Sequence, residues 1–163
     1  MLKQAFGVLV CLTFLLFFSV ILFQHSQSQP DRTKIFIITP TYARLTQGPE
    51  LVRLCSTLLH VRDIHWIIVE DSEHTTKEVT EFIERCKIPI TQLYAKSPST
   101  KRIRGSNQRN EGLRWIRNNT NLPELKGVVY FADDDNTYDP RIFEEVSCFS
   151  YAQRDHNFHP NIN

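Results

Sequence analysis

Three consecutive aspartates at positions 133–135 follow an apolar run at 127–132. Neighbouring carboxylates repel one another, and a divalent cation relieves that repulsion. Mg²⁺ and Mn²⁺ prefer oxygen ligands and usually keep positions open for substrate phosphates, so an ion here would stabilise charge on a departing diphosphate. An isolated Asp-x-Asp pattern more often marks an acidic surface turn. The apolar run in front of these aspartates favours the metal site instead.

Two arginines, Arg104 and Arg109, flank the expected start of a helix. Helix N-termini favour anions, and a guanidinium group binds phosphate through two parallel hydrogen bonds. This pair is therefore a candidate phosphate clamp. Lys96, Lys101 and Arg102 lie nearby, so a solvated basic loop is an equal alternative.

Tyr42 and Asp71 follow two other apolar runs. A tyrosine ring can stack on a nucleobase, and a carboxylate can accept a hydrogen bond from one. The alternatives are a locally packed aromatic residue and a helix cap. Only the two residues together indicate a nucleotide site.

Two short apolar runs, Ile35 to Ile38 and Trp66 to Val69, are typical of strands buried on both faces. Each is followed by apolar residues at helical spacing, at 51–58 and at 79–86. The first half of the chain therefore predicts strand, helix, strand, helix.

The second half continues this alternation. A weaker strand is expected at 90–95, a helix from Asn107 to about Arg117 with Ser106 as its N-cap, and a strand at 127–132. Asp139 and Pro140 then resemble the N-cap and first residue of another helix.

Strands that alternate with helices predict an α/β fold with a mostly parallel sheet. Ligands of such sheets bind beyond the carboxyl ends of the strands. This rule predicts that residues 40–42, 70–71 and 133–135 are neighbours in space.

The segment from Ala5 to Phe23 contains no charged residue. About 20 apolar residues in a helix cross the ~30 Å hydrocarbon core of a membrane, so this segment predicts a transmembrane anchor. A cleaved signal peptide is the alternative, but its apolar region is usually only ~7–15 residues long and ends at small residues. Lys3 favours a cytosolic N-terminus and a type II orientation.

Charge and cysteine usage narrow the remaining possibilities. The chain has 19 Lys and Arg against 18 Asp and Glu, which argues against a nucleic-acid partner. Cys55 and Cys86 fall on the apolar faces of the expected helices, and we predict buried free thiols and no disulfide. Asn118 begins an N-glycosylation sequon, which agrees with a lumenal location.

Four segments taken together closely resemble the Golgi β-1,3-glucuronyltransferases. They are ITPTYAR at 38–44, HWIIVED at 65–71, NQRNEGLRW at 107–115 and FADDDNTYD at 131–139. Their order and spacing match as well, from Lys34 to about Val146.

This resemblance implies a GT-A-type, Rossmann-like domain that uses UDP-glucuronate and Mn²⁺. It implies inverting transfer to the 3-hydroxyl of a terminal galactose, in a proteoglycan linker or a glycoprotein glycan. By position, Tyr42 and Asp71 resemble the residues that bind uracil, and Arg104 and Arg109 resemble those that contact the nucleotide and its phosphates. Asp133 and Asp134 resemble the contacts to sugar and ribose. Asp135 resembles the manganese ligand.

The resemblance ends near Ser147, whereas family members continue into an acceptor-binding half that supplies a glutamate general base. We therefore expect no catalytic residue in this chain and no transfer by it alone. The expected organisation is a cytosolic tail at 1–4, a signal anchor at 5–23, a stem at 24–33, a UDP-sugar-binding domain at 34–146 and a divergent tail at 147–163.

The expected location is the Golgi membrane, with a single type II span and the folded part in the lumen. The expected partners are UDP-glucuronate, a galactose-terminated acceptor and a further copy of the chain or a homologue. The alternative function is a non-catalytic protein that binds nucleotide or a partner.

Overall fold

The computed structural model describes residues 33–98, 105–120 and 127–147. Its centre is a 4-stranded sheet in the order β3-β2-β1-β4, in which every pairing is parallel. The strands are β1 (Lys34–Thr41), β2 (Ile64–Glu70), β3 (Ile90–Tyr94) and β4 (Gly127–Phe131). The predicted parallel α/β fold is confirmed, including the weak third strand.

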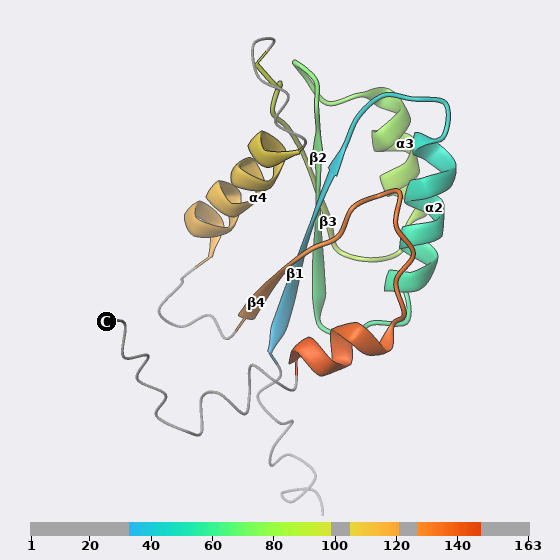
Figure 1. Cartoon of the computed structure of the whole chain (residues 1–163), viewed down its shortest axis with the longest axis vertical. Helices are drawn as coiled ribbons and strands as arrows, with labels where there is room; N and C mark the ends of the chain where they lie inside the picture. The colour runs from blue at the N-terminus through green and yellow to red at the C-terminus, as the bar shows by residue number, and fades with distance from the viewer. Residues whose placement is uncertain (1–32, 99–104, 121–126, 148–163) are drawn as a thin grey trace, which may run out of the picture. The chain divides into compact units, whose positions relative to one another are not determined.

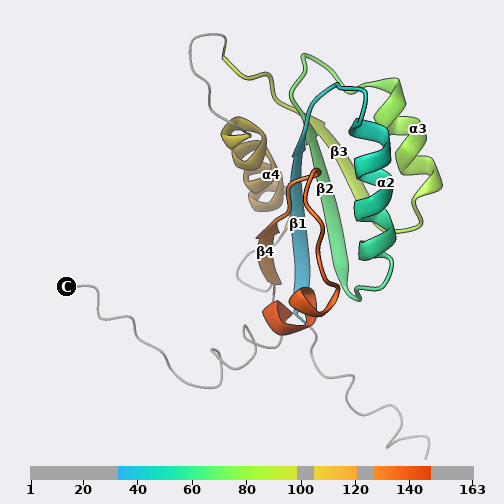
Figure 2. The same cartoon turned by 45° about the vertical axis from the view of Figure 1, so that its right-hand side comes forward.

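Helices cover both faces of the sheet, as Figures 1 and 2 show. α2 (Gln47–Leu58) and α3 (Lys77–Arg85) lie on one face, and α4 (Ser106–Asn119) lies on the other. Along β1, Ile35 and Ile37 belong to the core under α2 and α3, whereas Phe36 and Ile38 belong to the core under α4. Burial on both faces explains why this strand is a continuous apolar run.

The larger core lies under α2 and α3. Trp66 is completely buried there and packs edge-to-face against Phe82, with ring centroids 5.9 Å apart. Its Nε1–H donates to Thr39 Oγ1 over 2.8 Å, so the one polar atom of the side chain is satisfied.

α4 approaches β1 closely because its contact residue, Gly112, has no side chain. A Cβ atom at this position would lie 2.7 Å from Ile38 Cγ2. The helix also begins differently from the prediction. Gly105, with φ at 68°, occupies the N-cap position, and Ser106 is the first helical residue. The predicted Ser106 cap is wrong because the left-handed backbone at the preceding position favours glycine.

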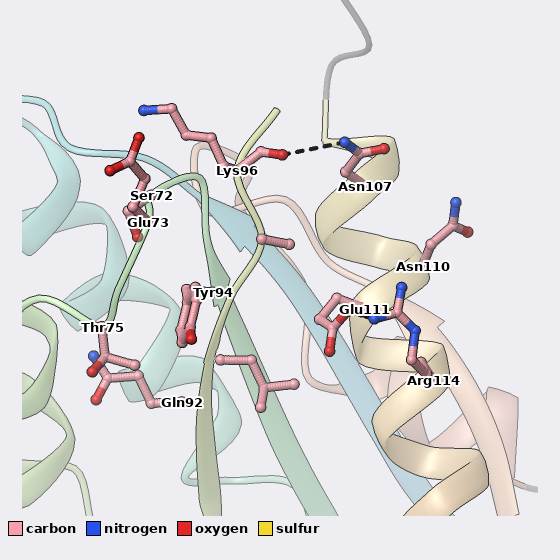
Figure 3. Close-up of a pocket in the computed structure, with 12 residues that line it drawn as sticks. Ser72, Glu73, Thr75, Gln92, Tyr94, Lys96, Asn107, Asn110, Glu111 and Arg114 are labelled. Atoms are coloured by element: carbon pink, nitrogen blue, oxygen red, sulfur yellow. Dashed lines mark hydrogen bonds and ion pairs between the residues drawn. The ribbon is translucent and has the colours of Figure 1, made fainter. Parts of the chain in front are cut away.

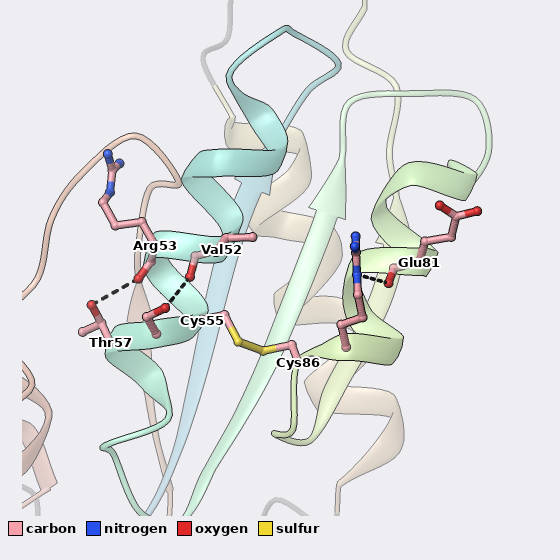
Figure 4. Close-up of a disulfide and its surroundings, with 8 residues drawn as sticks. Val52, Arg53, Cys55, Thr57, Glu81 and Cys86 are labelled. Atoms are coloured by element: carbon pink, nitrogen blue, oxygen red, sulfur yellow. Dashed lines mark hydrogen bonds between the residues drawn. A yellow bond between two sulfur atoms is a disulfide. The ribbon is translucent and has the colours of Figure 1, made fainter.

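A disulfide joins Cys55 of α2 to Cys86, the residue after α3 (Figure 4). Their Cα atoms are 6.4 Å apart, within the usual range for such a bond. The prediction of free thiols is wrong. The two helices pack side by side on the same sheet face, a proximity that the sequence spacing of 31 residues does not reveal.

Residues 141–147 form a further short helix. The Asp139 carboxylate accepts a hydrogen bond from Arg141 N over 3.0 Å, which confirms Asp139 as its cap. In the described part of the chain, no helix is long and apolar enough to cross a membrane. The predicted anchor at 5–23, the stem up to residue 32 and the tail from 148 lie outside that part.

Candidate functional site

The carboxyl ends of β1, β2 and β4 meet at one edge of the sheet. Thr41 pairs with Glu70 in the β1–β2 register, and Asp71 N donates to Thr41 O over 2.7 Å. The Thr41 hydroxyl donates to Asp134 Oδ2 over 2.6 Å. The structure thus confirms that residues 40–42, 70–71 and 133–135 are spatial neighbours.

Asp134 is buried, with 5% of its surface exposed, and its charge is balanced by Arg44. Arg44 Nη2 lies 2.8 Å from Asp134 Oδ1 and also pairs with Glu50. Burial alone would lower the pKa of Arg44, but the hydrogen bonds and charges of Asp134 and Glu50 raise it overall. The guanidinium therefore stays charged at any physiological pH.

Asp133 pairs with Arg109 of α4. Its backbone N–H donates to the Tyr138 hydroxyl over 2.7 Å, and burial raises the pKa of that phenol. The αL residue Gly105 sets the start of α4, and Arg109 N donates to Gly105 O over 3.0 Å in the first turn. Arg109 therefore lies near a helix start, as the sequence predicted. Its pairing with Asp133 was not predicted.

Asp135 differs from its two neighbours because its side chain is exposed. Among the residues that the structure describes, no hydrogen bond or ion pair engages its carboxylate, and no group of three or more His, Cys, Asp and Glu could hold a metal ion. Arg109 and Arg44 already balance Asp133 and Asp134, so these two carboxylates do not require a shared cation. Asp135 could supply one oxygen ligand to a divalent ion, and the other positions of that ion would stay open.

Tyr42 lies at the end of β1 with 56% of its surface exposed. The Arg44 guanidinium lies over its ring, 4.4 Å from the centroid. Arg44 Nη1 also donates to Tyr42 O over 3.3 Å. The ring is therefore held by Arg44 and retains exposed surface on which a nucleobase can stack.

Asp71 accepts a hydrogen bond at Oδ1 from Ser97 N over 2.7 Å. It does not cap the following helix, since Thr76 is the N-cap of α3. The preceding residue, Glu70, is 2% exposed and accepts hydrogen bonds from Thr76 N and Oγ1 and, over 2.6 Å, from Gln92 Nε2. These contacts fix the start of the loop that carries Asp71.

An open pocket of about 840 Å³ lies beside β3, between the loop after β2 and α4 (Figure 3). Its walls are of mixed polarity. They include Ser72 and Thr75 from the loop after β2, Leu93 and Tyr94 of β3, and Arg114 of α4. None of the predicted donor-binding residues in the described part of the chain lines it. The pocket therefore borders the strand-end site on its β3 side and is not the site itself.

The strand-end rule placed Thr41 and Glu70 at this edge of the sheet but gave them no role. The sequence did not single out Arg44, whose only signal was its place in the segment 38–44 that carries the family resemblance. Arg104 lies outside the described residues. Asn118 is exposed in the last turn of α4, where a glycan can be accommodated.

Comparisons with known proteins give consistent matches. Residues 54–150 match the model of glycosyltransferase family 43. The galactosylgalactosylxylosylprotein 3-beta-glucuronosyltransferase sqv-8 of Caenorhabditis elegans is 46% identical over 123 residues, covering 69% of this chain and 34% of that protein. Human galactosylgalactosylxylosylprotein 3-beta-glucuronosyltransferase 3 is 40% identical over 131 residues, covering 69% of this chain and 39% of that protein. The chain thus spans little more than a third of the length of these relatives.

A solved structure shares the fold. The crystal structure of S. aureus TarS, residues 1–349, superposes with a TM-score of 0.53 over 75% of this chain and 33% of that chain. Sequence identity in this superposition is 16%, so the likeness concerns the fold alone.

Proposed function

We propose, because this chain belongs to glycosyltransferase family 43, that its strand-end site binds UDP-glucuronate as the donor half of a GT-A-type 3-β-glucuronosyltransferase. The observation that carries this proposal is the meeting of Tyr42, Asp71 and residues 133–135 at one edge of the sheet. The relatives' names support the donor sugar and the transfer to a galactose-ended acceptor.

The nucleobase end of the donor is assigned to Tyr42 and Asp71. The exposed surface of the Tyr42 ring stacks on uracil. Asp71 Oδ1 is occupied by Ser97 N, and the carboxylate has further lone pairs to accept the uracil N–H. The family resemblance assigns the nucleotide to Arg104 as well, a residue outside the described part of the chain.

The diphosphate end is assigned to Arg109 and Asp135. Arg109 lies in the first turn of α4, where helix N–H groups also favour anions. Mn²⁺ bound by Asp135 would neutralise the charge that develops on departing UDP. Asp133 and Asp134 each keep acceptor sites beyond those taken by arginine and threonine, and these accept hydroxyl groups of the sugar and ribose.

We assign no general base to the described residues. Two of the three site aspartates are engaged by arginines, and the third is assigned to the metal. We therefore assign only donor binding to these residues. The acceptor, a terminal galactose that offers its 3-hydroxyl, belongs to the proposed activity of the complete enzyme.

The location proposed for this domain is the Golgi lumen, with the chain anchored as a type II membrane protein. Two described features support an oxidising, glycosylating compartment. One is the Cys55–Cys86 disulfide, and the other is the exposed sequon residue Asn118.

Calorimetric titration of the full chain with UDP, with Mn²⁺ or with EDTA, tests the proposed function. We expect binding that depends on Mn²⁺, and Asp135→Ala should remove that dependence. UDP binding that is equal with and without metal would contradict the metal assignment, and no UDP binding would contradict the proposed function. An assay with labelled UDP-glucuronate and a galactose-terminated acceptor then separates a transferase from a protein that only binds the donor.

A further inference from the structure

The two ends of the proposed donor site are joined by one side chain. We propose that Arg44 is a positioning residue that couples nucleobase recognition at Tyr42 to metal binding at Asp135. Arg44 touches Tyr42 directly and reaches the aspartates through Asp134. This inference rests on the proposed function and assigns a role to a residue outside the expected donor contacts.

On the nucleobase side, Arg44 determines how the Tyr42 ring is presented. Its guanidinium lies 4.4 Å from the ring centroid, and its Nη1 donates to the Tyr42 carbonyl over 3.3 Å. One contact restrains the ring and the other restrains the backbone that carries it. A surface tyrosine held in this way loses less rotational freedom when a base stacks on it. The restrained ring then presents uracil to Asp71, the residue proposed to accept its N–H, and the selectivity for UDP depends on that placement.

On the metal side, Arg44 fixes the residue before the proposed ligand. Asp134 is held through both carboxylate oxygens, by Arg44 at 2.8 Å and by Thr41 Oγ1 at 2.6 Å. The backbone carbonyls of Asp134 and Asn136 accept hydrogen bonds from Arg53 Nη2 over 3.2 and 3.3 Å. Asp135 lies between these two anchored residues, so its carboxylate starts from a defined place on the turn.

The chemistry of these contacts requires arginine. One planar guanidinium stacks on Tyr42 and also pairs with Asp134 and Glu50. A lysine ammonium is a compact point charge that cannot offer a flat face and a fork of donors together. Arg44→Lys therefore keeps the charge and removes the link.

The test measures two quantities on the full chain. The first is the ratio of the dissociation constants for UDP and GDP in Mn²⁺, and the second is the Mn²⁺ concentration that half-saturates UDP binding. Tyr42→Ala should lower the selectivity for UDP and leave the metal requirement in place, whereas Asp135→Ala should abolish the metal requirement. Arg44→Lys should change both quantities by about threefold or more, the range of a lost cation–π contact.

A matched control and a second variant keep the test decisive. Arg85→Lys makes the same change at an exposed arginine of α3 and should alter neither quantity. Glu50→Gln touches Arg44 but neither Tyr42 nor Asp134, and it should shift both quantities in the same direction to a smaller extent. If Arg44→Lys does not unfold cooperatively, Glu50→Gln decides.

The outcomes separate this inference from the proposed function. Absence of UDP binding by the wild-type chain overturns both. Normal wild-type binding, with a folded Arg44→Lys protein that changes only one quantity or neither, overturns the coupling alone. If Arg44→Lys does not fold, the Glu50→Gln protein is used instead. A change in only one quantity, or in neither, then overturns the coupling.

Discussion

Two buried carboxylates, Glu70 and Asp134, lie at the same edge of the sheet and are stabilised by different means. Glu70 accepts hydrogen bonds from neutral donors, the Thr76 backbone and hydroxyl and the Gln92 amide. Asp134 pairs with a cation, Arg44, and with one hydroxyl. A buried charge needs hydrogen-bond partners, and both carboxylates have them. Only Asp134 is also paired with an opposite charge.

The difference separates the two ends of the proposed donor site. Neutral donors around Glu70 connect the loop after β2 to β3, and they hold Asp71 in a framework that does not depend on a nearby cation. Asp134 belongs to a balanced set of charges with Arg44 and Glu50. A bound metal and diphosphate add charge to that set, so the side of the site with Asp134 should respond to bound ligands more than the framework around Asp71 does.

The largest expected effect concerns the scaffold that both ends share. Replacing Cys55 and Cys86 by alanine should lower the free energy of unfolding by about 3–4 kcal/mol, the chain-entropy value for a loop of this length. Denaturant titration measures this change. The UDP-to-GDP selectivity at low temperature should stay unchanged, because the disulfide joins α2 to the end of α3 and touches neither carboxylate. A change in selectivity would show that the disulfide influences the nucleobase end and does not act on stability alone.

Removing the cation should break the Asp134 end selectively. Arg44→Ala leaves Asp134 as an unpaired buried charge and should cost roughly 3 kcal/mol in the free energy of unfolding. Adding Asp134→Asn to this variant should recover part of the loss, since the buried charge is then gone. Equal stability of the Arg44→Ala and wild-type proteins would mean that the pair contributes nothing.

A smaller loss is expected at the Glu70 end. Gln92→Ala removes one neutral donor and leaves the two from Thr76, so the free energy of unfolding should fall by about 1–2 kcal/mol. Gln92→Glu is the informative companion, because it replaces a donor by a like charge and should cost more than alanine. If alanine costs as much as Arg44→Ala, the contrast between neutral and charged stabilisation fails.

The smallest effect is expected for an exposed carboxylate. The hydrogen bonds from Arg141 lower the pKa of Asp139 to about 2, below its ordinary value of 3.8. The stabilising contribution is present above 3.8 and is lost as the pH falls through about 2, because the unfolded chain takes up the proton first. An NMR titration of Asp139 should show this pKa, and Arg141→Gln should return it toward 3.8 with little change in stability. An unchanged pKa in the variant would exclude the Arg141 side chain as the main cause.

Local patterns were sufficient to predict the sheet. A continuous apolar run such as Trp66 to Val69 reports burial on both faces without knowledge of its neighbours, and the strand-end rule then locates the site. The cap at Asp139 was also predictable, because its donors are the next few residues.

Features that depend on distant partners were not predictable. Cys55 and Cys86 form a disulfide only because α2 and α3 pack together. The three aspartates are adjacent in sequence but have three different surroundings. Two of these involve arginines, one from the loop after β1 and one from α4. Arg44 showed no signal of its own, since its role depends on Tyr42, Glu50 and Asp134 together.

The close contact between Gly112 and Ile38 has a consequence for inherited variation. Any base change that replaces a glycine codon by another amino-acid codon introduces a Cβ atom, and at position 112 that atom would lie 2.7 Å from a buried methyl group. Any side chain there forces either α4 or Ile38 to shift, and a shift of α4 would also move Arg109 on the same helix. At Gly48 nothing lies within 4 Å of the corresponding atom. A population survey of this gene should therefore find alleles at codon 48 and very few at codon 112.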